Sequence, residues 1–244
     1  MSSHSSIIRK VQAGWNRIQT SIRQYLREHG DGCQIRNWPE FEFNHDGDLL
    51  HAEMSHPVVL WNWPYRGSSN NSGKKFHIVV NGRFTCRAGT EGEIELLSYG
   101  TQIGYFEPKS SSEPRTVIPI DGYHFDMEIT TQRAHPVFHA QRDETVLFDE
   151  LGRVDLTLGG NPPQATLRHV HLPTPQIDLL SALIMLIADH MVCDTETEEG
   201  FFQLARRARE FIPLKANLGN QAQLSQCIEH SELLLDHWYA PSAS

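Results

Sequence analysis

Residues 121–143 gather histidine and carboxylate side chains at spacings that suit β-strands. In an extended chain, alternate side chains point to opposite faces. If residues 123–129 are extended, His124, Asp126 and Glu128 therefore share one face, and the apolar residues between them share the other. Imidazoles beside a carboxylate on one surface are suited to acid–base catalysis or to binding a metal ion.

Residues 135–143 show the same alternation, with His135 and His139 on one side. The link between the two segments, TTQRA, has the length of a hairpin loop. If the segments pair as antiparallel strands, His139 comes near His124 or Asp126, because opposite and diagonal side chains on one face are neighbours. The predicted acid–base residues are His124, Asp126, His135 and His139.

Two further histidines, His169 and His171, are two positions apart in the segment TLRHVHL. On a strand both imidazoles would point the same way, and a third ligand from a neighbouring strand would leave a coordination position open. The predicted metal ligands are His139, His169 and His171. The alternative is that these histidines lie on a solvated sheet face. We favour this alternative, and hence no cofactor over a divalent metal, because short motifs often match by chance.

The short motifs of common enzyme classes do not occur in this chain: it has no GxSxG, no HExxH and no P-loop. The four cysteines, Cys33, Cys86, Cys193 and Cys227, include no CxxC pair. We interpret them as reduced thiols, which are typical of a cytoplasmic protein.

The formal net charge of −9 is unevenly distributed. Residues 1–27 hold five basic and no acidic residues, so the remaining 16 basic and 30 acidic residues leave about −14 on residues 28–244. This acidic body disfavours broad nucleic-acid binding, which needs a basic surface to contact phosphates. We expect no membrane insertion, because no apolar run approaches the roughly 18–20 residues that span a bilayer.

Residues 5–29 are predicted to form an amphipathic helix, because apolar residues recur every three or four positions. We favour packing of this apolar stripe on the rest of the chain. A protein partner or a second copy of the chain could use the same stripe instead, since such helix faces also form interfaces. The predicted partner-binding residues are Ile8, Val11, Trp15, Ile18 and Ile22.

Residues 37–172 change to the alternation and turn residues of β-strands. Asn81 and Gly82 lie between two β-rich arms at 76–88 and predict a type I′ hairpin turn. The other predicted elements include two strands that meet at Gly100, at 93–100 and 102–107, and a hairpin of residues 146–150 and 154–158.

Residues 174–239 are predicted to form a C-terminal helical part. Thr174 and Pro175 suit a helix start, with threonine as the N-cap and proline at the first helical position. The three predicted helices cover residues 176–192, 197–212 and 220–238.

A helix, then many consecutive strands, then helices predict one α+β domain over residues 1–244, with a mostly antiparallel sheet at about 41–172. The favoured function is that of a non-catalytic cytoplasmic interaction or accessory protein in a larger assembly. The alternative is a histidine-centred hydrolase or nuclease, with or without a divalent metal. Convergence of three of the histidine and carboxylate groups within about 4–5 Å of a common point, with an open side, would reverse this order, because geometry decides a site.

Overall fold

The structure is a computed structural model of the whole chain. It describes the following residues: 3–30, 32–64, 74–89, 94–127, 138–143, 145–161, 172–174, 177–191, 194–211 and 214–216. The described helices are α1 (Ser3–His29), α2 (Leu179–Met191), α3 (Thr195–Phe211) and the 3-10 helix η3 (Phe148–Val154).

One 11-stranded sheet contains all the described strands. These are β1 (Gln34–Arg36), β2 (Phe41–Asp46), β3 (Leu49–Met54), β4 (Val58–Pro64), β5 (Lys75–Ala88), β6 (Ile94–Pro108), β7 (Thr116–Met127), β8 (Phe138–Arg142), β9 (Thr157–Leu158), β10 (Leu172–Pro173) and β11 (Leu214–Ala216). The main path runs β1-β4-β5-β6-β7-β8-β10, and β3 joins it by pairing with the second half of β5. All pairings are antiparallel except β11 with β6 and β9 with β7, so the predicted α+β class is confirmed.

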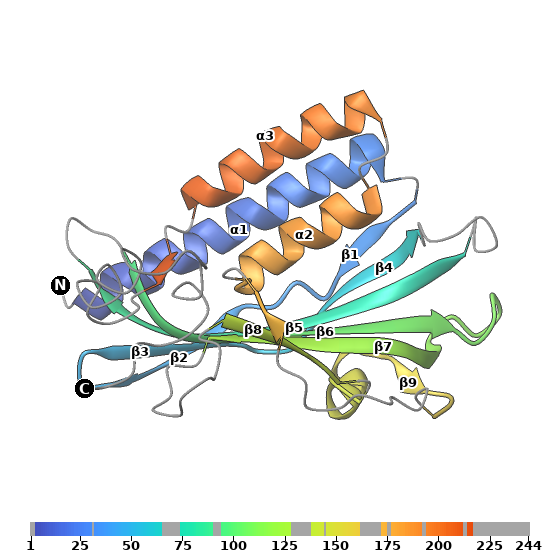
Figure 1. Cartoon of the computed structure of the whole chain (residues 1–244), viewed down its shortest axis with the longest axis horizontal. Coiled ribbons are helices and arrows are strands. Elements are labelled where there is room, and N and C mark those ends of the chain that lie inside the picture. Colours follow the sequence, from blue (N-terminus) through green and yellow to red (C-terminus); the bar gives the residue numbers. More distant parts are fainter. Residues whose placement is uncertain are drawn as a thin grey trace, which may run out of the picture.

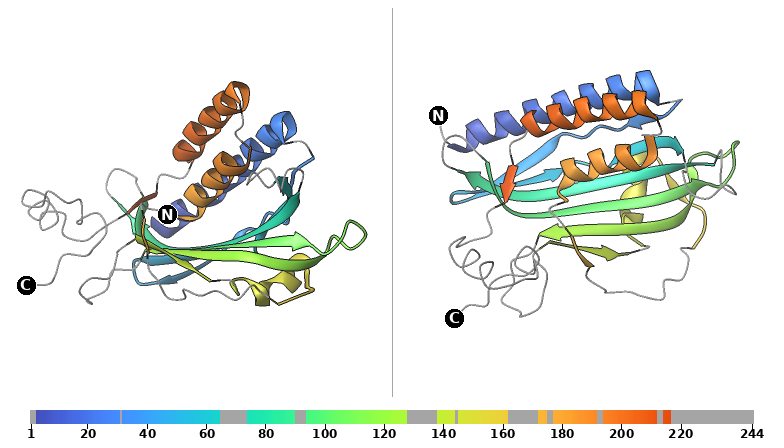
Figure 2. Two further views of the ribbon diagram at one scale, coloured as in Figure 1. Left: turned by 45° about the vertical axis from the view of Figure 1, so that its right-hand side comes forward. Right: turned by 45° about the horizontal axis from the view of Figure 1, so that its top comes forward.

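The three α-helices lie on one face of the curved sheet, which we call the inner face (Figures 1 and 2). The main core lies between them, because the apolar stripes of α1 and α2 meet alternate side chains of the long strands, such as Ile18, Leu183 and Ile78. The opposite, outer face carries η3 and β9 near one end of the sheet (Figure 1). Within the described part of the chain, no helix is both long and apolar enough to cross a membrane.

The apolar stripe of α1 packs on the inner face of the sheet. Val11, Trp15, Ile18 and Ile22 are each at most 2% exposed, and Ile8 is half-buried against the same core. The chain itself therefore covers the side chains that were candidates for partner binding, as expected if the stripe serves internal packing.

The predicted hairpin turn at Asn81 and Gly82 is wrong. Both residues continue the 14-residue strand β5, and they pair with Gln102 and Thr101 of β6. A β-carbon on Gly82 would lie 3.1 Å from three atoms of Leu179, so this glycine allows α2 to approach the sheet closely. Asn-Gly is a local signal, and long-range pairing of both arms with other strands overrides it.

Two other predictions about the strands are wrong. Residues 94–108 form the single strand β6, in which Gly100 pairs with neighbours on both sides and no bend divides the strand. Residues 148–154 form η3, and β9 pairs in parallel with β7, so the predicted hairpin around Gly152 does not form. The segment instead buries an apolar cluster on the outer face, made of Val146, Leu147, Leu151, Val154 and Leu156 against Val59, Trp61, Val79, Phe106 and Val117.

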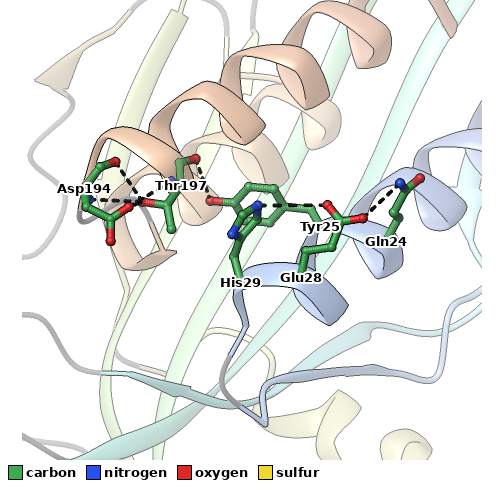
Figure 3. Close-up of polar contacts among 6 residues, drawn as sticks. All are labelled: Gln24, Tyr25, Glu28, His29, Asp194 and Thr197. Atoms are coloured by element: carbon green, nitrogen blue, oxygen red, sulfur yellow. Dashed lines mark hydrogen bonds and ion pairs between the residues drawn. The ribbon is translucent and has the colours of Figure 1, made fainter.

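The two C-terminal α-helices begin at aspartates. The carboxylate of Asp178 accepts from the backbone N–H of Ser181 at 2.9 Å, so α2 starts there and not at Thr174. Asp194 caps α3 in the same way through the N–H of Thr197 at 2.9 Å. The Tyr25 hydroxyl of α1 donates to the Thr197 carbonyl oxygen, which attaches α3 to α1 (Figure 3). The predicted helix at 220–238 lies outside the described residues.

His77 on β5 is fully buried and held as a neutral imidazole by two backbone groups. The backbone N–H of Asn62 donates to Nδ1 at 3.2 Å, and Nε2 lies 3.0 Å from the carbonyl oxygen of Pro114. A nitrogen that accepts from an N–H carries no proton, so Nε2 is the protonated nitrogen. Burial lowers the pKa of His77 from 6.5, and the charge of Arg36 lowers it further.

We expect His77 to make the folded state lose stability as the pH falls. Because its folded pKa is below 6.5, its contribution is complete above that pH and is lost below it, where the unfolded chain takes up a proton. The added slope is at most about 1.4 kcal/mol per pH unit. Denaturant midpoints from pH 7.5 to 5 should fall less steeply in His77→Gln, which keeps one acceptor and one donor. An unchanged slope would contradict this, and His56→Gln is the matched control.

Candidate functional site

The strand register aligns charged side chains in one row across the outer face. Along successive pairings, Glu42 of β2 lies opposite Glu53 of β3, and Glu53 lies opposite Arg83 of β5. The same row continues through Gly100 of β6 to Asp126 of β7 and His139 of β8. Cross-strand neighbours on one face have β-carbons about 4.5–5.5 Å apart. The row therefore connects residues that are far apart in the sequence.

Three of these outer-face residues converge where β7 pairs with β8. Asp126 lies directly opposite His139, and the alternation of β7 puts His124 on the same face as Asp126. Oδ2 of Asp126 is 3.4 Å from Nε2 of His124 and 3.9 Å from Nε2 of His139. The expectation that His139 comes near His124 or Asp126 is confirmed, because β7 and β8 pair as antiparallel strands with Phe125 and Phe138 in the core.

The three side chains offer one ligand atom each, and these atoms all lie within 4.8 Å of one another. A tetrahedral ion with bonds of about 2.0–2.1 Å holds its ligand atoms roughly 3.4 Å apart. The widest separation in the cluster would therefore have to shorten by up to about 1.4 Å, which small rotations of the side chains provide. His139 has 3% of its side chain exposed, against 21% for His124 and 32% for Asp126, so the cluster is closed on the His139 side and open on the other.

Two imidazoles and one carboxylate are a donor set that suits zinc and other divalent transition metals. Three protein ligands with an open position are the arrangement that lets a bound water lose a proton near neutral pH and attack a substrate. Without an ion, the same geometry places a carboxylate between two imidazoles, where it can orient one of them as a general base. The arrangement thus fits hydrolytic chemistry in either form.

His135, His169 and His171 lie outside the described residues. Of the predicted site residues, the structure therefore brings together His124, Asp126 and His139.

Burial raises the pKa of the Cys86 thiol to about 12, so this cysteine is a structural residue and not a nucleophile.

The cluster borders a cavity of about 260 Å³ on the outer face. Its lining residues are Glu53, Asn81, Gly82, Arg83, Gly100, Gln102, His124 and Asp126. Sequence reasoning did not identify Glu53, Arg83 or Gln102 as site residues. Local patterns place Arg83 in a hairpin arm and Gln102 in a short strand, and only the register of β5 and β6 shows that they face Asp126 and His124.

Gly100 leaves room for the carboxylate of Asp126. A β-carbon at this position would lie 2.9 Å from Oδ1 of Asp126, so the Asp126 side chain would have to move. We expect Gly100→Ala to weaken divalent-metal binding by about tenfold with little loss of stability, because the displaced atom ends a rotatable side chain. Metal titration and thermal unfolding of the same variant measure the two effects. Gly152→Ala, where nothing lies within 4 Å, is the control, and equal metal affinity in both variants would contradict the prediction.

The chain matches no protein-family model, no curated protein and no solved structure.

Proposed function

We propose that His124, Asp126 and His139 bind a divalent metal ion and that the chain is a metal-dependent hydrolase. The observation that supports this proposal is the convergence of three ligand atoms within 4.8 Å, from two paired strands, with an open side. A histidine that only faces solvent would be exposed. The side chain of His139 is instead 3% exposed and lies beside Asp126, which His124 also approaches. The two histidines and the carboxylate instead match the ligand sets of hydrolytic metal centres.

The non-catalytic interaction protein favoured by the sequence becomes the second proposal. The absence of common catalytic motifs and the apolar stripe of α1 both favour it, but the side chains of that stripe contribute to the core of the chain itself. A protein partner or a second copy would therefore have to use another surface. A cytoplasmic location remains part of the proposal. It is supported by Cys86, a buried free thiol, and by Cys33, whose buried thiol donates to the carbonyl oxygen of Asn62.

Metal titration tests the proposed function directly. Metal-depleted protein titrated with Zn²⁺ or Mn²⁺ in a calorimeter should bind one ion per chain, and the loaded protein should hydrolyse generic ester substrates that the metal-depleted protein leaves intact. His51→Gln is a suitable control, because His51 is an exposed histidine on β3 that hydrogen-bonds Thr85 and lies outside the cluster. Absence of binding in the unmodified chain would reject the metal site and return the non-catalytic role to first place.

A further inference from the structure

Arg83 places a guanidinium group beside the proposed metal site. It lies one strand away from Asp126 in the same row, because both residues pair with Gly100. The side chain is exposed and makes no ion pair or hydrogen bond with the residues that the structure describes. Arginine in such a position is a ready ligand for phosphate or carboxylate oxygens, to which it donates two parallel hydrogen bonds.

Gly100 keeps the space between Arg83 and Asp126 open. A β-carbon there would be 2.9 Å from Oδ1 of Asp126 and 3.4 Å from Nε of Arg83, so both side chains lie next to this glycine on the outer face. A molecule that fills this space would therefore touch the guanidinium on one side and, on the other, the carboxylate of Asp126, which is a ligand of the proposed ion. Glycine in a strand interior weakens the strand, and it is expected where a ligand approaches the backbone closely.

The charges that line the cavity explain which ligand could enter it. Glu53 and Asp126 carry negative charge and Arg83 carries positive charge, so these three side chains give the lining one net negative charge. A divalent ion on the cluster would change this balance to one net positive charge. The side-chain oxygen of Asn81 accepts from the backbone N–H of Gly82 at 2.9 Å, which leaves its amide N–H groups as donors. Gln102 contributes a second side-chain amide to the lining of the cavity.

We propose that this cavity binds the phosphate group of a small phosphate ester, with oxygens shared between Arg83 and the ion. The inference rests on the proposed function, because without the ion the negative lining would repel the anion. In the reaction, a bond forms between water oxygen and phosphorus and the ester P–O bond breaks. The water gives up a proton and the departing alcohol takes one up, so no other reactant is needed.

Inorganic phosphate and Mn²⁺ are the probes that test this inference. Electron paramagnetic resonance counts the bound Mn²⁺, and the enhanced ³¹P relaxation of phosphate reports an anion close to the bound ion. We expect Arg83→Gln to bind Mn²⁺ like the unmodified chain and to weaken phosphate binding by about tenfold or more, the effect of losing a charge-assisted bidentate contact. Arg87→Gln removes the same charge from the same strand and should leave phosphate binding unchanged, because Arg87 pairs with Glu95 and Asp48.

The outcomes separate the two proposals. Normal Mn²⁺ binding with equal phosphate affinity in Arg83→Gln and the unmodified chain would overturn the phosphate site and leave the metal site intact. Failure of the unmodified chain to bind Mn²⁺ would reject the proposed function and, with it, this inference. Phosphate binding of equal strength with and without Mn²⁺ would also overturn it, because the ion is required to reverse the charge of the cavity.

Discussion

Asp126→Asn is expected to weaken Zn²⁺ binding by roughly 100-fold or more, because it removes the one charged ligand from the proposed centre. Asparagine has nearly the same shape as aspartate, so the β7–β8 pairing that positions the residue should persist. The measurement is competition with a chromophoric chelator, with circular dichroism to show that the variant folds. Metal-dependent hydrolysis should fall with the occupancy of the site.

The two histidines provide an independent comparison with Asp126. His124→Gln and His139→Gln should each weaken Zn²⁺ binding, whereas the control His51→Gln should not, although it also removes an imidazole from the sheet. His139 is the more buried ligand, so His139→Gln also reports the cost of placing an amide in a site that is 3% exposed. Unchanged affinity in all three cluster variants would show that any bound ion lies elsewhere.

Trp15→Ala should destabilise the folded chain by about 3–5 kcal/mol, the range found when a buried large aromatic side chain is truncated to alanine. Trp15 is 2% exposed and stacks on Trp38 with 4.2 Å between the ring centroids. Its indole N–H donates to the carbonyl oxygen of Pro39 at 2.8 Å, and that carbonyl would lose this partner. The loss should appear as a lower denaturant midpoint, followed by circular dichroism.

Two matched variants separate the contributions of Trp15. Trp15→Phe keeps most of the apolar contact but removes the hydrogen bond, so we expect a loss of about 1–2 kcal/mol. Gln12→Ala lies on the exposed side of α1 and should change stability by no more than about 0.5 kcal/mol. If Trp15→Ala behaved like Gln12→Ala, the packing of α1 on the sheet would not be a main source of stability.

Some elements could be predicted from local sequence because local and global preferences agree in them. The three-and-four spacing of apolar residues predicted α1, and the same stripe is the surface that the sheet buries. Alternation in residues 123–129 and 135–143 predicted a pair of strands and the face of each that is core, and β7 and β8 pair over residues 123–127 and 138–142. The same pattern put His124, Asp126 and His139 in one candidate group, together with His135, His169 and His171.

Other features were decided only by tertiary pairing. Asn81 and Gly82 carry the residues of a tight turn, yet β5 continues through them because its halves pair with β4 and β3 on one side and with β6 on the other. Local turn preference amounts to a small free energy, and two ladders of hydrogen bonds outweigh it. The missing side chain of Gly82 leaves room for Leu179 of α2, and no local sequence pattern predicts this contact.

Local sequence patterns predict the helical stripe, the alternation of the strands and a candidate site that contains His124, Asp126 and His139. The position of Arg83, Gly100 and Glu53 in the same row follows from the pairing of the strands, because each of these residues comes from a different strand. The register of a strand depends on which partner covers its apolar face, and a shift of one residue would turn Arg83 toward the core. The composition of the cavity is therefore a property of the assembled sheet.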